Sequence, residues 1–530
     1  MLTARTFELV DLDWQRIQLA VRLRAGTDTA LGSASIGLRH DSSGERMPAT
    51  HVEAVGAELL VRFNVMQGPG QRPLAPGRWD LVVEDDAVPV TTALPDSAEN
   101  PRSFRIRGVE FRATPRLDAT TGRLTLEVEV QPFHDPAIPP RPWIRRVAGR
   151  VKRWIRKVRP ALFEVLFRVC RAVARRNGRR ILFTSDSRAE LGGNLKIVYD
   201  RMVERGLDRE YELQTLFKLR VTARRSFRDR LRLPWLLGRT DVIVIDDYQP
   251  VIYRVHDPDV RIVQLWHAVG SFKTVGYSRV GKPGAPNPYS NIHKNYTYAI
   301  VSARNDVQFY AEAFGIPEER VVPTGIPRVD VFLDRLRQGG LRGPMERAYP
   351  ETRGRRTILF APTFRGRGAK SATYDFDSID FAALFDVCVE RDAVCIVRMH
   401  PFVREPLVIP PGFRDRIVDG SRSSLDVNEL LYGIDLLITD YSSIVYEYSI
   451  LGRPMLFYAY DLEDYVGSRD FYEPYETFVP GRIVRTFAEL VDAIRNESYE
   501  LEKVAPFAAR HFEHLDGRST DRVIDLIVGR

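Results

Sequence analysis

The sequence predicts an α/β protein with a pair of Rossmann-type domains and a cleft between them, preceded by an all-β sandwich and a basic helical segment. Three observations support this fold class. Residues 1–135 contain alternating apolar and polar runs between turn residues, as half-buried strands do. From Arg179 onward, short apolar runs alternate with helix-like segments, the pattern of open parallel sheets. Between these regions, residues 141–180 hold 15 Lys or Arg residues and one acidic residue, Glu164.

The predicted β-sandwich covers residues 1–135. Gly, Pro, Asp and Ser turns separate its alternating runs, which predicts short antiparallel strands. The clearest runs are RIQLAVRL (16–23), LLVRFNV (59–65), RWDLVV (78–83) and LTLEVEV (124–130). This region shows no catalytic constellation, so it either contacts a polymer acceptor or packs as an accessory domain.

Residues 136–178 are expected to form a Pro-rich linker followed by basic amphipathic helices. Apolar residues recur there at helical spacing between Arg and Lys: Trp143, Val147, Val151, Trp154, Ile155 and Val158, then Leu162, Val165, Leu166 and Val169. Two tryptophans on a basic helix favour an anionic membrane surface. A helix packed on the next domain and a nucleic-acid arm are the alternatives, and the apolar stripe argues against nucleic acid.

Two α/β domains are expected at 179–345 and 346–530, joined by a linker over roughly 338–355. The predicted strands are 181–184, 242–245, 261–265, 297–301 and 320–323 in the first, and 357–361, 394–399, 434–438, 455–458 and 483–484 in the second. Ser519 is a candidate cap for a closing helix. Two such domains facing a cleft form the GT-B arrangement of transferases that use nucleotide-activated donors.

Composition favours a cytoplasmic protein. No apolar run is long enough to span a bilayer, and the first residues, MLTARTFELVDLDW, contain no apolar signal core. The three cysteines, Cys170, Cys388 and Cys395, have neither metal-ligand spacing nor a disulfide pattern. A protein bound peripherally to the inner face of the membrane is therefore expected, with no resident metal.

The stretch Ile434–Pro454 predicts a strand, a polar break and a helix start. Ser442 and Ser443 lie in the break, where unpaired helix N–H groups could bind an anion. Simple capping of the helix is the alternative, and the two roles are compatible.

Other polar residues also follow predicted strands, at the edge where parallel sheets bind ligands. They are His267, Lys273, Arg328, Thr363, Arg365, His400 and Asp440, with Gly325 in the same stretch as Arg328. Cations and helix N–H groups suit a pyrophosphate, and a histidine can transfer protons near neutral pH.

These residues lie in motifs that resemble one family. The motifs are WHAVGSFKTVG (266–276), TGIPRVD (324–330), LFAPTFR (359–365), RMHP (398–401) and TDYSSIVYEYSILGRP (439–454). In this order, over about residues 180–525, they resemble the CDP-glycerol:poly(glycerophosphate) glycerophosphotransferases of teichoic acid synthesis. Members commonly read WHG followed by threonine, whereas this chain has Ala268 and Val269 after His267. The difference concerns the adjoining acceptor loop.

The resemblance implies transfer of glycerol phosphate from CDP-glycerol to a lipid-linked polyol-phosphate chain, with release of CMP. It makes His267 and His400 the catalytic pair. We expect His267 to act as general base and His400 with Arg365 to stabilise charge on the transferring and leaving phosphates. Ser442 and Ser443 would meet the pyrophosphate, and Glu447 the ribose or cytosine.

The expected donor site contains Lys273, Gly325, Arg328, Thr363, Arg365, Asp440, Ser442, Ser443 and Glu447. The turn Gly192, Gly193 and Asn194 is either an acceptor-side loop or a plain turn. No cofactor is required by the residues, although a Mg²⁺ ion on the pyrophosphate stays open.

Three alternatives remain for the function. The first is the same reaction with CDP-ribitol or another CDP-polyol, since no named residue separates the two donors. The second is a sugar transferase that uses a nucleotide sugar. The third is an inactive polymer-binding protein at the membrane. The sequence leaves the oligomeric state open, as it does the choice between a priming and a polymerising enzyme.

Overall fold

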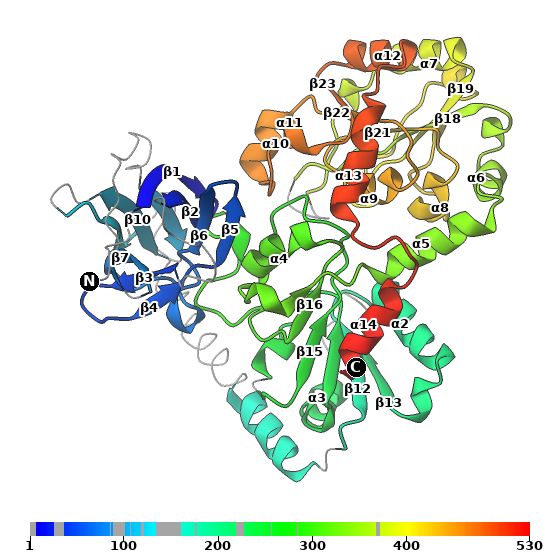
Figure 1. Cartoon of the computed structure of the whole chain (residues 1–530). Coiled ribbons are helices and arrows are strands. Elements are labelled where there is room, and N and C mark those ends of the chain that lie inside the picture. The colour runs from blue at the N-terminus through cyan, green and yellow to red at the C-terminus, as the bar shows by residue number, and fades with distance from the viewer. Residues whose placement is uncertain are drawn as a thin grey trace, which may run out of the picture.

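The computed structural model describes residues 7–25, 36–84, 86–87, 101–106, 108–117, 121–133, 161–174, 177–218, 227–255, 257–282, 285–366 and 371–529. Its described part contains two antiparallel sheets, followed by two parallel sheets that are flanked by helices (Figure 1). The predicted α/β class with parallel sheets is thereby confirmed.

The two antiparallel sheets form the β domain and share one core. One sheet has the order β1-β2-β6-β5, and the other has the order β4-β3-β7-β11-β10-β9 with β8 beside β7. The strands are β1 (Phe7–Gln15), β2 (Gln18–Ala25), β3 (Ile36–His40), β4 (Arg46–Pro48), β5 (His51–Val55), β6 (Glu58–Asn64), β7 (Gly77–Val83), β8 (Asp86–Ala87), β9 (Arg102–Ile106), β10 (Val109–Leu117) and β11 (Leu124–Pro132). Val21 of the first sheet and Trp79 of the second belong to one buried apolar cluster. Tyr277 and Val280 join it from the α/β region, so the β domain is docked there.

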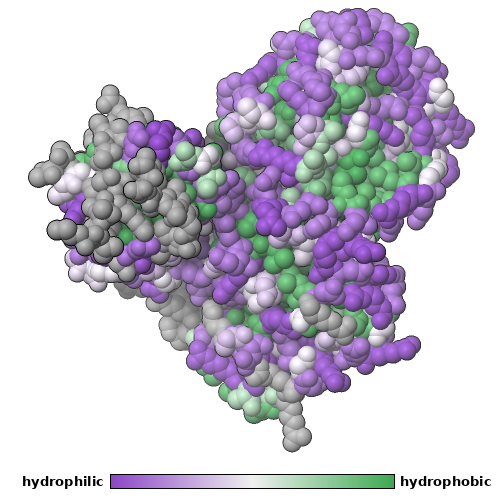
Figure 2. Space-filling view, viewed as in Figure 1, coloured by the Kyte–Doolittle hydropathy of each residue, from purple (hydrophilic) through white to green (hydrophobic). Residues whose placement is uncertain are grey.

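A helix at residues 161–173 precedes the parallel sheets. Phe167 is buried against Leu233 and Leu237 of the next region. The opposite face exposes apolar side chains at four successive turns: Leu162, Val165, Leu166, Val169 and Val173. Figure 2 shows hydrophobic surface at the lower end of the molecule, where Figure 1 draws this cyan helix. The predicted amphipathic stretch with Trp143 and Trp154 lies outside the described residues.

The first parallel sheet has the order β13-β12-β14-β15-β16-β17. Its strands are β12 (Arg180–Ser185), β13 (Glu212–Phe217), β14 (Val242–Ile245), β15 (Arg261–Gln264), β16 (Tyr298–Ile300) and β17 (Val321–Val322). Its helices are α2 (Gly193–Glu204), α3 (Phe227–Arg239), α4 (Val307–Phe314) and α5 (Pro327–Gln338). We call this part of the chain the first unit. β13 was not predicted, because this edge strand has no continuous apolar run.

The second parallel sheet has the order β20-β19-β18-β21-β22-β23. Its strands are β18 (Arg356–Phe360), β19 (Ala393–Val397), β20 (Ile417–Asp419), β21 (Leu436–Thr439), β22 (Met455–Tyr458) and β23 (Arg482–Val484). Its helices, in what we call the second unit, are α6 (Gly343–Ala348), α7 (Phe381–Glu390), α8 (Val427–Leu431), α9 (Ile444–Ser449), α10 (Leu462–Ser468), α11 (Tyr475–Phe478), α12 (Phe487–Arg495) and α13 (Val504–His511). The linker expected over 338–355 was wrong in part, since α6 forms there around the fully buried Met345.

The helix α14 (Ser519–Val528) packs against α2 and α5 of the first unit. The Ser519 side chain does not cap this helix. The Asp330 side chain in α5 accepts hydrogen bonds from the N–H groups at its start instead. The Asp330 carboxylate accepts the N–H groups of Ser519 and Thr520 at 3.1 and 2.6 Å. The closing helix, which was expected in the second domain, therefore packs against the first unit.

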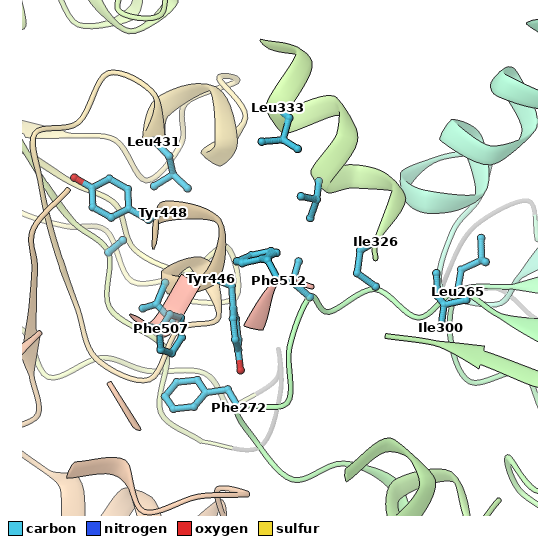
Figure 3. Packing of buried hydrophobic residues seen from close by; sticks show 14 of the residues in the cluster. Leu265, Phe272, Ile300, Ile326, Leu333, Leu431, Tyr446, Tyr448, Phe507 and Phe512 are labelled. Carbon is cyan, nitrogen blue, oxygen red and sulfur yellow. The ribbon is translucent and has the colours of Figure 1, made fainter. Parts of the chain in front are cut away.

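One buried apolar cluster runs through both units (Figure 3). Leu265 and Ile326 come from the first unit, and Leu431 and Tyr446 from the second. Figure 3 shows Phe272 of the first unit beside Tyr446. A shared core of this kind makes the junction between the units part of the folded interior.

Among the described residues, no helix is both long enough and apolar enough to cross a membrane.

Candidate active site

His267 lies just beyond β15, after a strained backbone position. Trp266 has a φ of 49°, in the left-handed region that costs a bulky residue about 1–3 kcal/mol. The Gln264 side-chain oxygen accepts the N–H of Trp266, and the Asn194 amide donates to the Trp266 carbonyl oxygen, both at 2.9 Å. This turn leaves the His267 side chain 50% exposed.

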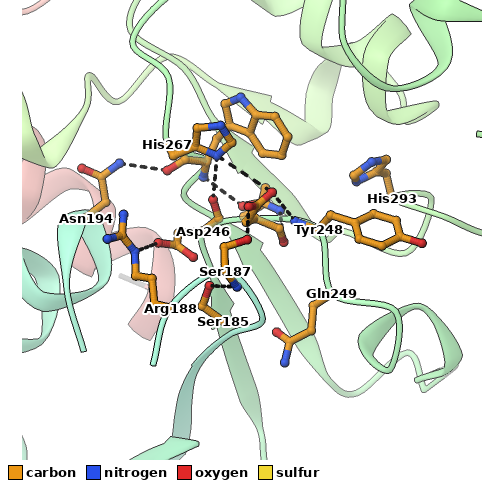
Figure 4. A network of polar contacts seen from close by, with 12 residues as sticks. Ser185, Ser187, Arg188, Asn194, Asp246, Tyr248, Gln249, His267 and His293 are labelled. Atoms are coloured by element: carbon orange, nitrogen blue, oxygen red, sulfur yellow. Dashed lines mark hydrogen bonds and ion pairs between the residues drawn. The ribbon is translucent and has the colours of Figure 1, made fainter. Parts of the chain in front are cut away.

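The imidazole of His267 has hydrogen-bond acceptors on one side (Figure 4). Its Nδ1 lies 3.4 Å from the Asp246 carbonyl oxygen and 3.9 Å from Oδ1 of Asp247. Asp247 is held by the hydroxyl of Ser187 and by the N–H of Tyr248. Acceptors at Nδ1 favour the proton on that nitrogen, which leaves Nε2 with a lone pair for a base.

Asp246 and Asp247 were not among the predicted site residues. They follow β14 directly, so the rule that polar residues collect at the ends of parallel strands could have found them. Their contact with His267, however, depends on how β14 pairs with β15, and this register cannot be predicted from the sequence.

The turn Gly192–Gly193–Asn194 lies beside His267. Nε of Arg188 pairs with Oδ2 of Asp246 at 2.6 Å. Gly193 has a φ of 55°, which favours glycine, and a Cβ there would lie 2.4 Å from Nη2 of Arg188 and would displace this guanidinium. The structure thus places the turn Gly192–Gly193–Asn194 beside His267. Contact of this turn with the acceptor stays a prediction.

Arg328 and Glu447 join the two units beside His267. The N–H of Arg328 donates to Oδ1 of Asn194 at 3.2 Å, and Nη1 donates to the His267 carbonyl oxygen at 2.9 Å. Nη2 pairs with the buried carboxylate of Glu447 in α9. Both residues were predicted to contact the donor, and here they contact each other, so donor contact stays a prediction.

His400 lies just beyond β19 of the second unit. Its Nδ1 accepts the N–H of Phe402 at 3.1 Å, so the neutral ring carries its proton on Nε2 and can donate from there. Burial lowers the pKa of His400 below its ordinary value, and the charges of Lys273 and Arg469 lower it further. The ring is therefore neutral near pH 7 and is a hydrogen-bond donor.

The two cations that act on His400 come from different units. Lys273 follows the His267 turn, and its Nζ lies over the ring of Tyr465 at 5.4 Å. Arg469 follows α10, donates to the Gly366 carbonyl oxygen at 3.1 Å and lies 5.1 Å from the Phe364 ring centre. Positive charge beside His400 suits a phosphate group. Lys273 was predicted, whereas Arg469 was missed because it follows a helix and no strand.

Arg365 and Asp440 have a structural role in this conformation. The guanidinium of Arg365 binds Asp440 at 3.0 Å and forms a two-point pair with Asp461. Asp440 also accepts the N–H of Thr363 at 2.8 Å. The predicted contacts of Arg365, Asp440 and Thr363 with the donor stay predictions, because most of these polar groups are already paired.

Ser442 and Ser443 precede α9 as expected. Ser443 is the residue at the helix start, and its side chain makes no capping hydrogen bond. Ser442 Oγ accepts the N–H of Ile444 at 3.4 Å, a long contact. Capping is therefore weak here, and the expected contact of both serines with the pyrophosphate stays a prediction.

Gly325 has a packing role. Its φ is 78°, and a Cβ there would lie 2.3 Å from Oγ of Ser519 in α14. The structure explains this glycine by close approach of a helix, and its expected donor contact stays a prediction.

A cavity of about 320 Å³ opens beside His400. It lies at the carboxyl ends of β19 and β20, between residues that include Val403, Arg404, Leu407 and Ser421. Its size and position suit part of a nucleotide. Within the described ranges, no three His, Cys, Asp or Glu side chains are arranged to hold a metal ion.

Two parallel-sheet units that share one buried core, each with a histidine just beyond a strand, form a GT-B-like fold. Residues 166–529 match the CDP-glycerol:poly(glycerophosphate) glycerophosphotransferase family, and the chain belongs to this family. It is an enzyme that transfers polyol phosphate in teichoic acid synthesis.

Named relatives agree with this assignment. The chain is similar to the teichoic acid ribitol-phosphate polymerase TarK of Staphylococcus aureus, at 49% identity over 69% of this chain and 71% of that protein. It is similar to TarL, a ribitol-phosphate polymerase of the same organism, at 38% identity over 97% of this chain and 98% of that protein. The solved structure of the wall teichoic acid polymerase TagF has the same fold, with a TM-score of 0.55 at 22% identity over 72% of this chain and 96% of that chain.

Proposed function

We propose that this enzyme is a ribitol-phosphate polymerase that uses CDP-ribitol. The observation that carries the proposal is the match to TarL, which extends through the β domain and over nearly the whole of both chains. The family resemblance implies CDP-glycerol as donor, with CDP-ribitol as the alternative. The two ribitol-phosphate polymerases, TarK and TarL, support CDP-ribitol better than CDP-glycerol.

In the proposed reaction, a terminal hydroxyl of the polymer attacks the phosphorus that bears the ribitol. Nε2 of His267 takes the hydroxyl proton, a new P–O bond forms, and the anhydride P–O bond breaks to release CMP. His400 donates a hydrogen bond from Nε2 to the transferring phosphate, and Lys273 and Arg469 offset its negative charge. The hydrogen-bond acceptors that lie beside Nδ1 of His267 support its role as base, because they favour a free lone pair on Nε2.

The other expected donor residues complete the proposal. Ser442, Ser443 and the start of α9 hold the phosphate of the leaving CMP. A Mg²⁺ ion could enter with the pyrophosphate, where it would neutralise charge, and no residue of the chain needs it in the steps above.

The donor assay gives the direct test. Purified enzyme with a lipid-linked polyol-phosphate acceptor is expected to release CMP from CDP-ribitol at least about tenfold faster than from CDP-glycerol, since polar groups that bind the longer polyol are left unpaired by the shorter one. CMP release and product length are measured together.

CMP release from CDP-glycerol alone would contradict the ribitol proposal. Addition of a single unit would indicate a primase. Release from neither donor would favour the polymer-binding alternative, and release only from a nucleotide sugar would favour a glycosyltransferase.

We further propose that the helix at 161–173 docks on an anionic membrane surface. Its exposed apolar face contains Leu162 and Val169, and Trp235 of α3 is 45% exposed nearby, with Arg239 over its ring. Apolar side chains on a helix beside a basic segment suit the interface of an anionic bilayer, where a lipid-linked acceptor would reside.

Replacing Leu162 and Val169 by serine is expected to weaken binding to vesicles of mixed phosphatidylcholine and phosphatidylglycerol about tenfold, because two apolar side chains leave the bilayer. Vesicle sedimentation measures this. The matched control changes Val52 and Val55, which are similarly exposed on β5 of the β domain, and leaves binding unchanged. Equal binding of wild type to neutral vesicles would contradict the electrostatic part.

A further inference from the structure

The turn between β1 and β2 reaches both units through one side chain, Arg16. Its Nε and Nη2 donate to the Glu312 carboxylate in α4 at 2.9 and 3.2 Å. Its Nη1 donates to the carbonyl oxygen of Tyr472, between α10 and α11, at 3.0 Å. Glu312 belongs to the first unit and Tyr472 to the second. The guanidinium therefore joins the β domain to both halves of the transferase.

The surroundings of Arg16 are specific for a guanidinium. Only 13% of its side chain is exposed, and the Glu312 side chain is fully buried. The guanidinium carbon lies 5.0 Å from the Tyr472 ring centre and 5.6 Å from that of Phe309. Gln18 also donates to the Glu312 carboxylate. A planar fork between two rings and a carboxylate is a site that lysine cannot reproduce.

Residues 469–472, which we call the crossover segment, pair with residues 272–274 of the first unit. The N–H of Thr274 donates to the Asp470 carbonyl oxygen at 2.9 Å, and the N–H of Tyr472 donates to the Phe272 carbonyl oxygen at 3.3 Å. The rings of Phe272 and Phe471 stack at 4.9 Å. Arg16 thus binds the carbonyl oxygen of Tyr472, and the N–H of the same residue forms one of the two hydrogen bonds between the segments.

Each of the two paired segments carries one cation of the candidate active site. Lys273 lies in the middle of the first, and Arg469 begins the crossover segment. The guanidinium of Arg469 lies over Phe364, whose ring contacts the His400 ring at a centroid distance of 4.7 Å. A shift of the crossover segment would therefore move positive charge relative to His400.

We propose that Arg16 is a positioning residue for phosphate transfer. It fixes the crossover segment against residues 272–274 and so holds Lys273 and Arg469 beside His400. The proposal rests on the proposed function, and it gives the β domain a part in catalysis without substrate contact. The sequence left two roles for the β domain, contact with the acceptor or packing as an accessory domain. In this proposal the β domain packs on the transferase, and the same contact supports catalysis.

The test compares two contacts of the β domain. Arg16→Ala removes the links to Glu312 and Tyr472, whereas His51→Ala removes the 2.9 Å contact with Glu318 of the first unit and a 3.6 Å ion pair with Glu53 within the β domain. Arg16→Ala is expected to lower kcat/KM for CDP-ribitol about fivefold or more, and His51→Ala to leave it within about twofold. The KM for the acceptor is expected to stay within about twofold in both.

Hydrogen exchange supplies a readout that does not need turnover. The amides of Thr274 and Tyr472 are expected to exchange faster in Arg16→Ala and at the wild-type rate in His51→Ala. Circular dichroism checks folding, and Glu312→Gln, which disturbs the same site from the first unit, is expected to act in the same direction. If wild type turns over no CDP-polyol, the proposed function fails while exchange still tests the link. Unchanged exchange and activity in Arg16→Ala, or equal effects of His51→Ala, would overturn the proposal.

Discussion

Replacing His267 by alanine is expected to lower turnover at least about a hundredfold, the lower range for loss of a general base. The variant should fold normally, because the side chain is half exposed and its ring contributes little to the core. CMP release under saturating CDP-ribitol measures the loss, and thermal unfolding checks the fold.

Two controls separate loss of a base from general damage. His514→Ala removes a partly buried histidine outside the candidate active site, and it is expected to keep wild-type turnover. Added imidazole is expected to restore part of the activity of His267→Ala, because a small base can enter the exposed position. Near-wild-type turnover of the purified variant would remove His267 from the mechanism.

Replacing His400 by alanine is also expected to cost at least about a hundredfold, here through loss of a hydrogen bond to the transferring phosphate. The ring is neutral, because burial together with Lys273 and Arg469 lowers its pKa. His400→Gln places an amide N–H near the position of Nε2 and is expected to recover a measurable part of the activity. Initial rates of the two variants at one pH give the comparison.

The glutamine substitution distinguishes the roles of the two histidines. At His267, glutamine offers no base and should be as inactive as alanine. An active His267→Gln together with an inactive His400→Gln would reverse the assignment. His400→Ala at wild-type turnover would show that the cations alone stabilise the phosphate.

Much of the fold could be read from local pattern. Buried parallel strands are short apolar runs, so β12, β14, β18 and β21 were found close to their observed bounds. The positions of the two histidines just after β15 and β19 were also predicted from the sequence, while their catalytic roles stay predictions. The structure differs at edge strands such as β13 and β20, where burial is too incomplete to leave an apolar run.

The partners of the site residues could not be read in the same way. Arg365 pairs with Asp461, which is 96 residues away, and Arg328 pairs with Glu447, which is 119 residues away. A sequence shows that an arginine follows a strand, but not whether a carboxylate from another element already neutralises it. The glycines pose the same problem, since Gly325 is explained by α14 and no local turn pattern reveals that approach.

The position of α14 has a consequence for protein synthesis. Ser519, whose N–H binds Asp330, is made 189 residues after it, so the first unit emerges from the ribosome long before the helix that covers α2 and α5. Until α14 is made, the apolar surface that receives Val523, Ile524 and Ile527 has no cover from the chain. During synthesis the first unit is therefore expected to expose this hydrophobic surface until the second unit and α14 have been made.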